Sequence, residues 1–112
     1  MSVELTVFRT GAVALPRSSF APWLLPPERD ELVDCPVWSA LLRTPEGLIV
    51  FDTGLHPVHV ERPEATFGPN PAMRITMAAE DAIVARLATI GVQPDEVTVV
   101  VNSHLHFDHA GN

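Results

Sequence analysis

The chain has little cysteine and little positive charge. Its 112 residues include a single cysteine, Cys35, so an internal disulfide bond is excluded. Seven basic residues stand against fourteen acidic ones, which gives a formal net charge of −7 at pH 7. We therefore expect no nucleic-acid partner, and no ribonuclease with a basic groove for its substrate.

Long apolar runs are missing as well. The opening residues do not have the pattern of a secretory signal, and no segment predicts a membrane span, so we expect a cytoplasmic protein without a membrane partner. Hydrophobic residues nevertheless make up 46% of the chain, which argues against disorder. Length and composition predict a single domain over residues 1–112.

Apolar patterns predict several strands. Residues 3–9 alternate apolar and polar side chains, as in a half-buried strand. Two apolar runs, 37–43 and 48–51, flank a turn sequence at 44–47 that contains proline and glycine, and this pattern predicts a hairpin. A β-branched run at 97–101 predicts the last strand.

One helix is predicted, at residues 78–90. Its apolar side chains recur at helical spacing and would cover one face of the sheet. These side chains are Ile83, Val84, Leu87 and Ile90. Gly91 suits the end of this helix, while the proline-containing segments 14–36 and 54–74 are predicted to be loops.

Four potential metal ligands gather directly after the last predicted strand. His104, His106, Asp108 and His109 lie within six positions. Alternate side chains of an extended segment share a face, so His104 and His106 can bind one ion. A turn at Asp108 and His109 could direct these two side chains to a second ion beside the first. Imidazole nitrogens and carboxylate oxygens are the ligands that zinc and similar divalent ions take.

The other two histidines, His56 and His59, have a less specific pattern. They lie in a proline-containing loop and not in a cluster of ligands. A single histidine in such a place is most often a surface residue or a satisfied core residue. We predict that neither one is a metal ligand.

The C-terminal motif resembles that of a known family. The sequence His-Leu-His-Phe-Asp-His at 104–109 resembles the H-x-H-x-D-H signature of the metallo-β-lactamase superfamily. Segments 35–38 and 48–54 look like the paired strands and the D-T-G turn of its N-terminal half. Segments 51–57 and 102–111 most resemble the branch of the N-acyl homoserine lactonases, which are quorum-quenching enzymes.

The resemblance implies a fold and a set of metal ligands. The fold is α+β, with the αββα metallo-β-lactamase architecture, of which this chain would be the N-terminal half: a mixed β-sheet with one covering helix. Two divalent metal ions are implied, with zinc as the default. His104 and His106 would bind the first ion, Asp108 and His109 the second, and Asp52 would hydrogen-bond near the metal loop and orient it.

The resemblance also implies a reaction. A hydroxide that bridges two metals attacks the carbonyl of an N-acyl homoserine lactone, and the ring opens. Asp108 is predicted as the catalytic residue, and Phe107 would lie where the acyl group or ring of this small-molecule substrate passes. Related thioester or ester hydrolases of the glyoxalase II type carry a similar motif, so they are an alternative.

The chain also departs from the family. Members have a longer domain, with a further His, a bridging Asp and a last His in the second half, and the lactonases also use a Tyr near the metals. This chain contains no tyrosine and ends at Asn112. We therefore expect that it needs a missing C-terminal half, or self-association, to form an active site. A metal-binding fragment without catalysis is the corresponding alternative.

A third alternative comes from another short match. Asp52-Thr53-Gly54 follows an apolar run, as in the catalytic loop of an aspartic protease. A chain of this length could complete a two-carboxylate site by dimerising. A three-residue match has low specificity, and this interpretation leaves the histidine cluster unexplained.

Overall fold

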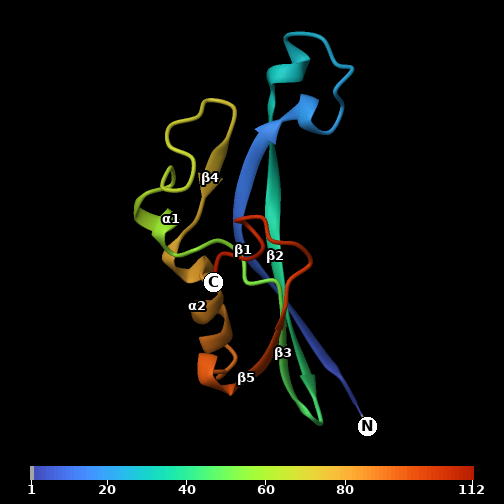
Figure 1. Ribbon diagram of the computed structural model, residues 1–112, viewed down its shortest axis with the longest axis vertical. Coiled ribbons are helices and arrows are strands. Elements are labelled where there is room, and N and C mark those ends of the chain that lie inside the picture. Colours follow the sequence, from blue (N-terminus) through green and yellow to red (C-terminus); the bar gives the residue numbers. More distant parts are fainter. Residues whose placement is uncertain (1) are drawn as a thin grey trace.

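A five-stranded mixed sheet forms the frame of the computed structural model, which describes residues 2–112 (Figure 1). The spatial order is β4-β1-β2-β3-β5. The strands are β1 (Glu4–Pro16), β2 (Leu32–Thr44), β3 (Gly47–Phe51), β4 (Arg74–Thr76) and β5 (Val97–Val101). Neighbours are antiparallel except β3 and β5, which are parallel. The predicted mixed sheet is confirmed.

Strands β1 and β2 form a long arm that carries a loop at its end (Figure 1). Their pairing continues to Pro16 and Leu32, so the predicted loop at 14–36 is wrong at both ends. Pro36 is tolerated because it pairs with Ala12 beside a β-bulge, where a strand can accommodate proline. The loop that remains contains two short 3-10 turns, Arg17–Ser19 and Glu28–Asp30.

The predicted hairpin at 37–51 is confirmed. Strands β2 and β3 pair from Ala40 and Phe51 to Thr44 and Gly47. The Thr44 hydroxyl donates to the Gly47 carbonyl over 2.9 Å and closes the turn. Because β3 then runs parallel to β5, the two strands end at the same edge of the sheet.

The predicted helix is shorter than 78–90. A 3-10 turn, Ala79–Asp81, precedes helix α2, which spans Ile83–Ala88. The break lies at Ala82, whose ψ of 139° is extended. At the other end, Gly91 has a φ of 74°, and bonds from Val92 N to Leu87 O and from Gly91 N to Ala88 O close the helix. The predicted glycine stop is confirmed.

The chain also contains a second short helix, and an arginine connects α2 to the sheet. The predicted loop at 54–74 contains a four-residue helix, α1 (Val58–Glu61). Arg86 ties α2 to the sheet, because it donates to the Arg9 carbonyl over 2.8 Å and binds the Asp81 carboxylate over 2.7 Å. Among residues 2–112, no helix is both long and apolar enough to cross a bilayer.

The buried core lies on one face of the sheet, in two parts. The part under α2 consists of Phe8, Leu41, Val50, Ile83, Leu87 and Val92. The part near α1 and β4 consists of Val13, Val37, Leu55, Ile75 and Met77. From the predicted helix face only Ile83 and Leu87 are buried, whereas Val84 is exposed on α2 and Ile90 is exposed beyond its end.

The opposite face of the sheet is apolar and open. The strand register places alternate side chains of β1, β2, β3 and β5 in one row on this face. Exposed members of the row are Leu5, Val7, Trp38, Phe51, Val99 and Val101. An apolar sheet face of this kind requires another layer to bury it. The described residues therefore bury a core on the α2 side of the sheet and leave the opposite apolar face uncovered.

Candidate metal centre

The D-T-G turn and the histidine motif meet at one edge of the sheet. The turn follows β3 and the motif follows β5, and parallel neighbours end at the same edge. Backbone bonds join the two segments: Asp52 N to Val101 O and Thr53 N to His109 O, each 2.8 Å, and Gly111 N to Gly54 O, 3.0 Å. The motif loop is therefore held at both ends by the turn.

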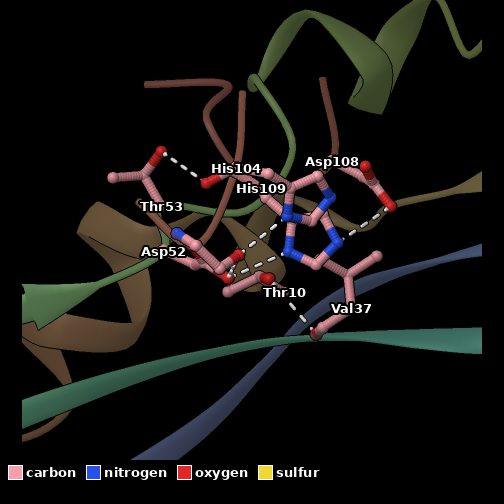
Figure 2. A network of polar contacts seen from close by, with 8 residues as sticks. Thr10, Val37, Asp52, Thr53, His104, Asp108 and His109 are labelled. Carbon is pink, nitrogen blue, oxygen red and sulfur yellow. Dashed lines mark hydrogen bonds and ion pairs between the residues drawn. The ribbon is translucent and has the colours of Figure 1, made fainter. Parts of the chain in front are cut away.

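Asp52 lies at the centre of this junction (Figure 2). It is 4% exposed and has a φ of 58°, and its carboxylate is hydrogen-bonded to residues of the motif loop. One oxygen accepts the Ser103 backbone N–H at 2.7 Å, and the other accepts the Ser103 hydroxyl at 2.8 Å and His109 Nδ1–H at 2.9 Å. The predicted contact of Asp52 with the metal loop is thus present.

The same contacts keep Asp52 ionised. Burial by itself raises the pKa of this carboxyl, but the hydrogen bonds from the Ser103 backbone, His109 and the Ser103 hydroxyl outweigh burial. The nearby His109 adds a coulombic contribution in the same direction. The net result is a pKa below the ordinary value of 3.8. A charged acceptor therefore lies under the motif at neutral pH.

The hydrogen bonds also decide where the ring protons of two histidines lie. A carboxylate can only accept, so His109 Nδ1 carries the proton and its Nε2 has a free lone pair. The single hydroxyl proton of Ser103 goes to Asp52, so Ser103 accepts from His104 Nδ1 at 2.9 Å. His104 Nε2 then has a free lone pair too. Metal-binding histidines typically show this pattern.

Three of the four predicted ligands form a compact group. Ligand atoms of His104, Asp108 and His109 all lie within 4.8 Å of one another. His109 Nε2 is 3.4 Å from an Asp108 carboxylate oxygen (Figure 2). Two lone pairs that face each other at this distance repel unless a cation lies between them. The donors fit a divalent ion with nitrogen and oxygen ligands.

His106 lies beside this group. Its ring centroid is 4.8 Å from that of His104, but it is not one of the three residues whose ligand atoms converge. The structure therefore places His104 with Asp108 and His109, whereas the sequence pattern paired it with His106. All four side chains still lie on one short loop after β5.

The remaining predicted residues are found close by. Phe107 is half-buried and contacts Phe67, with ring centroids 4.8 Å apart, and His59, at 6.0 Å. His59 is buried with both ring nitrogens hydrogen-bonded, and His56 is exposed and accepts the Val58 N–H at 3.0 Å. Both lie outside the group of His104, Asp108 and His109.

Several residues that support the site were not predicted from the sequence. Thr53 accepts the Asn112 N–H at 3.0 Å, and the Asn112 amide donates to Thr53 O and Leu55 O. Thr10 is fully buried beneath the turn, and a Cβ on Gly54 would collide with its hydroxyl. The glycine is required here by close packing as well as by its φ of 73°. Only a tertiary contact reveals these roles.

Comparison with known proteins identifies the family. A sequence model described as Metallo-beta-lactamase superfamily matches residues 32–112. The chain belongs to this superfamily. The aspartic protease alternative is therefore excluded, and the site gives the reason: Asp52 is buried and both its oxygens are occupied by Ser103 and His109.

Relatives within the superfamily are lactonases. An N-acyl homoserine lactonase from Bacillus cereus is 41% identical over 104 residues, which cover 90% of this chain and 40% of that protein. N-acyl homoserine lactonase AiiB from Agrobacterium fabrum is 34% identical over 99 residues, which cover 84% of this chain and 34% of that protein. The chain thus spans about 40% of the length of the first curated relatives it matches.

Solved structures agree with this placement. An N-acyl homoserine lactone hydrolase with N-hexanoyl-L-homoserine bound at its catalytic metal centre superposes with a TM-score of 0.85 at 37% sequence identity. The match covers 99% of this chain and 44% of that one. The chain therefore has the metallo-beta-lactamase fold, of which it contains a part.

Proposed function

We propose that this chain supplies the metal-binding edge of an N-acyl homoserine lactonase, a metal-dependent hydrolase that opens the lactone ring. One observation carries the proposal: His104, Asp108 and His109 converge with free lone pairs. The identity to lactonases along nearly the whole chain supports the choice of substrate class over thioesters.

The residues present fit divalent metal binding, and we propose two ions, with zinc as the default metal. His104, Asp108 and His109 would hold metal directly, and His106 lies near enough to complete the set from the exposed side. When bound, divalent ions supply a hydroxide nucleophile at neutral pH and polarise the lactone carbonyl. We propose that Asp108 is the residue of this chain that lies nearest to the reacting atoms.

Other residues position this group and the substrate. Asp52 holds His109 directly and His104 through Ser103, so one carboxylate orients two ligands. Phe107, half-buried beside the ligands, would contact the acyl group or the ring of the lactone. Because the chain spans about 40% of its relatives, we propose that a C-terminal portion or a second copy completes the site. The cytoplasmic location stays a prediction.

The proposal can be tested by completing the chain. Residues 1–112 are joined to the C-terminal portion of the Bacillus cereus lactonase that the match does not cover. Acid release from N-hexanoyl homoserine lactone is then followed with a pH indicator, in parallel with hydrolysis of a glutathione thioester. We expect lactone hydrolysis that is lost in the His109→Ala variant and on chelation.

Two results would count against this function. Hydrolysis of the thioester but not the lactone would replace the substrate class. A well-folded joined protein that contains metal and cleaves neither compound would contradict the hydrolase proposal. Elemental analysis of the same samples gives the metal content, and circular dichroism shows whether each sample is folded.

A further inference from the structure

His59 is a buried polar residue with no role in the metal group. It is 1% exposed, at the buried side of helix α1. Its Nδ1 is 3.2 Å from the Pro63 carbonyl, and its Nε2 is 3.0 Å from the Thr66 hydroxyl. Burying an imidazole costs free energy unless both nitrogens find partners. Here both partners come from the next loop, residues 62–68.

The proton arrangement of this contact is defined by its partners. A carbonyl oxygen only accepts, so His59 Nδ1 donates to Pro63. The neutral ring then accepts at Nε2, and the Thr66 hydroxyl donates to it. His59 therefore fixes the two ends of a short loop segment, with one bond to the backbone and one to a side chain. The Gly68 N–H bond to Glu64 O, 2.7 Å, closes the same loop.

This anchored loop reaches the motif through aromatic contacts. Phe67, next to Thr66, packs edge-on against Phe107 with ring centroids 4.8 Å apart and an angle of 82°. His59 contacts the same Phe107 ring at 6.0 Å and 64°. Phe107 lies between two metal-ligand candidates in the sequence. Phe67 is 53% exposed, so one side of the aromatic pair stays open to a ligand.

Phe67 also lines a small cavity. Its volume is about 90 Å³, and its lining is mixed, since Pro63, Met73 and Ile75 are joined by Glu64, Asn70 and Arg74. A movement of the loop would therefore change two surfaces together: the aromatic pair beside the motif and this cavity. Apolar surfaces such as the aromatic pair discriminate ligands by the number of methylene groups that they bury.

We propose that His59 is a positioning residue which, with Thr66, sets the preference of the site for acyl-chain length. This inference rests on the proposed lactonase function. His59 holds the 62–68 loop so that Phe67 and Phe107 form a fixed apolar wall. A long acyl chain contacts this wall and a short one does not, so the anchor affects long-chain substrates selectively.

The decisive variant removes one hydrogen-bonding group without changing the shape of the loop. Thr66→Val deletes the hydroxyl that donates to His59, and Thr66→Ser keeps it. His59→Gln tests whether an acceptor near the Nε2 position is sufficient. Thr89→Val is the matched control, because the Thr89 hydroxyl also donates one hydrogen bond, to the Arg86 carbonyl, but lies at the end of α2. His59→Ala is not used alone, since it also opens a cavity.

The first readout is amide hydrogen exchange of the 112-residue chain. Loss of one buried hydrogen bond predicts exchange about 5- to 10-fold faster in Thr66→Val at Gly68 and Ala65, whose N–H groups are hydrogen-bonded within the 62–68 loop. Thr66→Ser and Thr89→Val should exchange at these two amides like the unmodified chain. Unchanged exchange in Thr66→Val would refute the anchoring role of His59.

The second readout is substrate preference in the protein joined to the C-terminal portion of the lactonase. For Thr66→Val we expect kcat/KM for N-decanoyl homoserine lactone to fall about 5-fold while kcat/KM for the N-butanoyl compound changes less than about 2-fold. A merely structural role would lower both values equally, and this result would refute the selectivity role. If the unmodified joined protein cleaves no lactone, the lactonase proposal fails, while hydrogen exchange still decides the anchor.

Discussion

Two regions of this protein differ in how the ring nitrogens of their histidines are hydrogen-bonded. In the motif loop, His104 and His109 each use Nδ1 to donate a hydrogen bond and leave Nε2 free. In helix α1, His59 has both ring nitrogens engaged within the protein, by partners in the loop that follows. Both kinds of ring are held firmly, but only the first has an open lone pair. The difference between the proposed ligands and the structural histidine therefore lies in what the second nitrogen contacts.

The largest expected effect comes from removing a ligand. His109→Ala deletes one lone pair and leaves Asp52 without one of its donors. We expect zinc affinity of the 112-residue chain to fall by more than about 100-fold, measured by competition with a chromophoric chelator. Asp108→Ala in the joined protein should deplete mainly one of two metals by elemental analysis. Unchanged metal content in both variants would contradict the ligand group.

Next is the carboxylate that orders both histidines. Asp52→Asn keeps the shape of the side chain, but its amide places a donor or a weaker acceptor opposite His109 Nδ1. The ring is then free to carry its proton on Nε2, which blocks the ligand position. We expect a loss of zinc affinity of about 10- to 100-fold. Histidine tautomers measured by ¹⁵N NMR in the metal-free chain give an independent check, and an unaltered Nδ1–H tautomer would argue against this role.

A smaller effect is expected from the residue between Asp52 and His104. Ser103→Ala removes the hydroxyl that connects them, but the Ser103 backbone N–H bond to Asp52 remains. Only one of the two histidines loses its support, so we expect zinc affinity to fall about 10-fold. Ser103→Thr retains the hydroxyl and is the control. Equal affinities for the alanine and threonine variants would show that Ser103 does not orient His104.

The pH dependence of stability follows from the lowered pKa of Asp52. Because the folded state holds this pKa below its ordinary value of 3.8, the folded state binds the proton less readily than the unfolded chain. The stabilisation is therefore fully present above this value and is lost as pH falls through the folded pKa. Denaturant unfolding with a chelator present should show a difference between the unmodified chain and Asp52→Asn that shrinks below about pH 4. A constant difference would contradict the shift.

The smallest effect is expected from the two histidines outside the motif loop, His56 before α1 and His59 within it. His56→Ala and His59→Gln leave the motif loop intact, so zinc affinity should change by less than about 2-fold. The same chelator competition measures it. A loss comparable to that of His109→Ala would mean that our distinction between the two kinds of histidine is wrong.

Patterns confined to one segment were predicted well. The hairpin turn at 44–47, the strand before the motif and the stop at Gly91 each depend on neighbouring residues. The errors lie where another element changes the outcome. Residues 14–16 and 32–36 join the sheet despite their prolines because a partner strand with a bulge accepts them. Ala82 interrupts the helix, although its neighbours favour helical structure.

The sequence by itself determined which side chains could bind metal, because four potential ligands within six positions, directly after a β-branched run, are typical of a metal site. The tertiary structure decided which nitrogens are free to bind it. The contacts that place the ring protons join residues 51 to 57 positions apart, from Ser103 to Asp52 and from His109 to Asp52. Such contacts arise only because β3 and β5 pair in parallel and end at the same edge. No local pattern carries that information, since the direction of a strand pair depends on the connection between the strands.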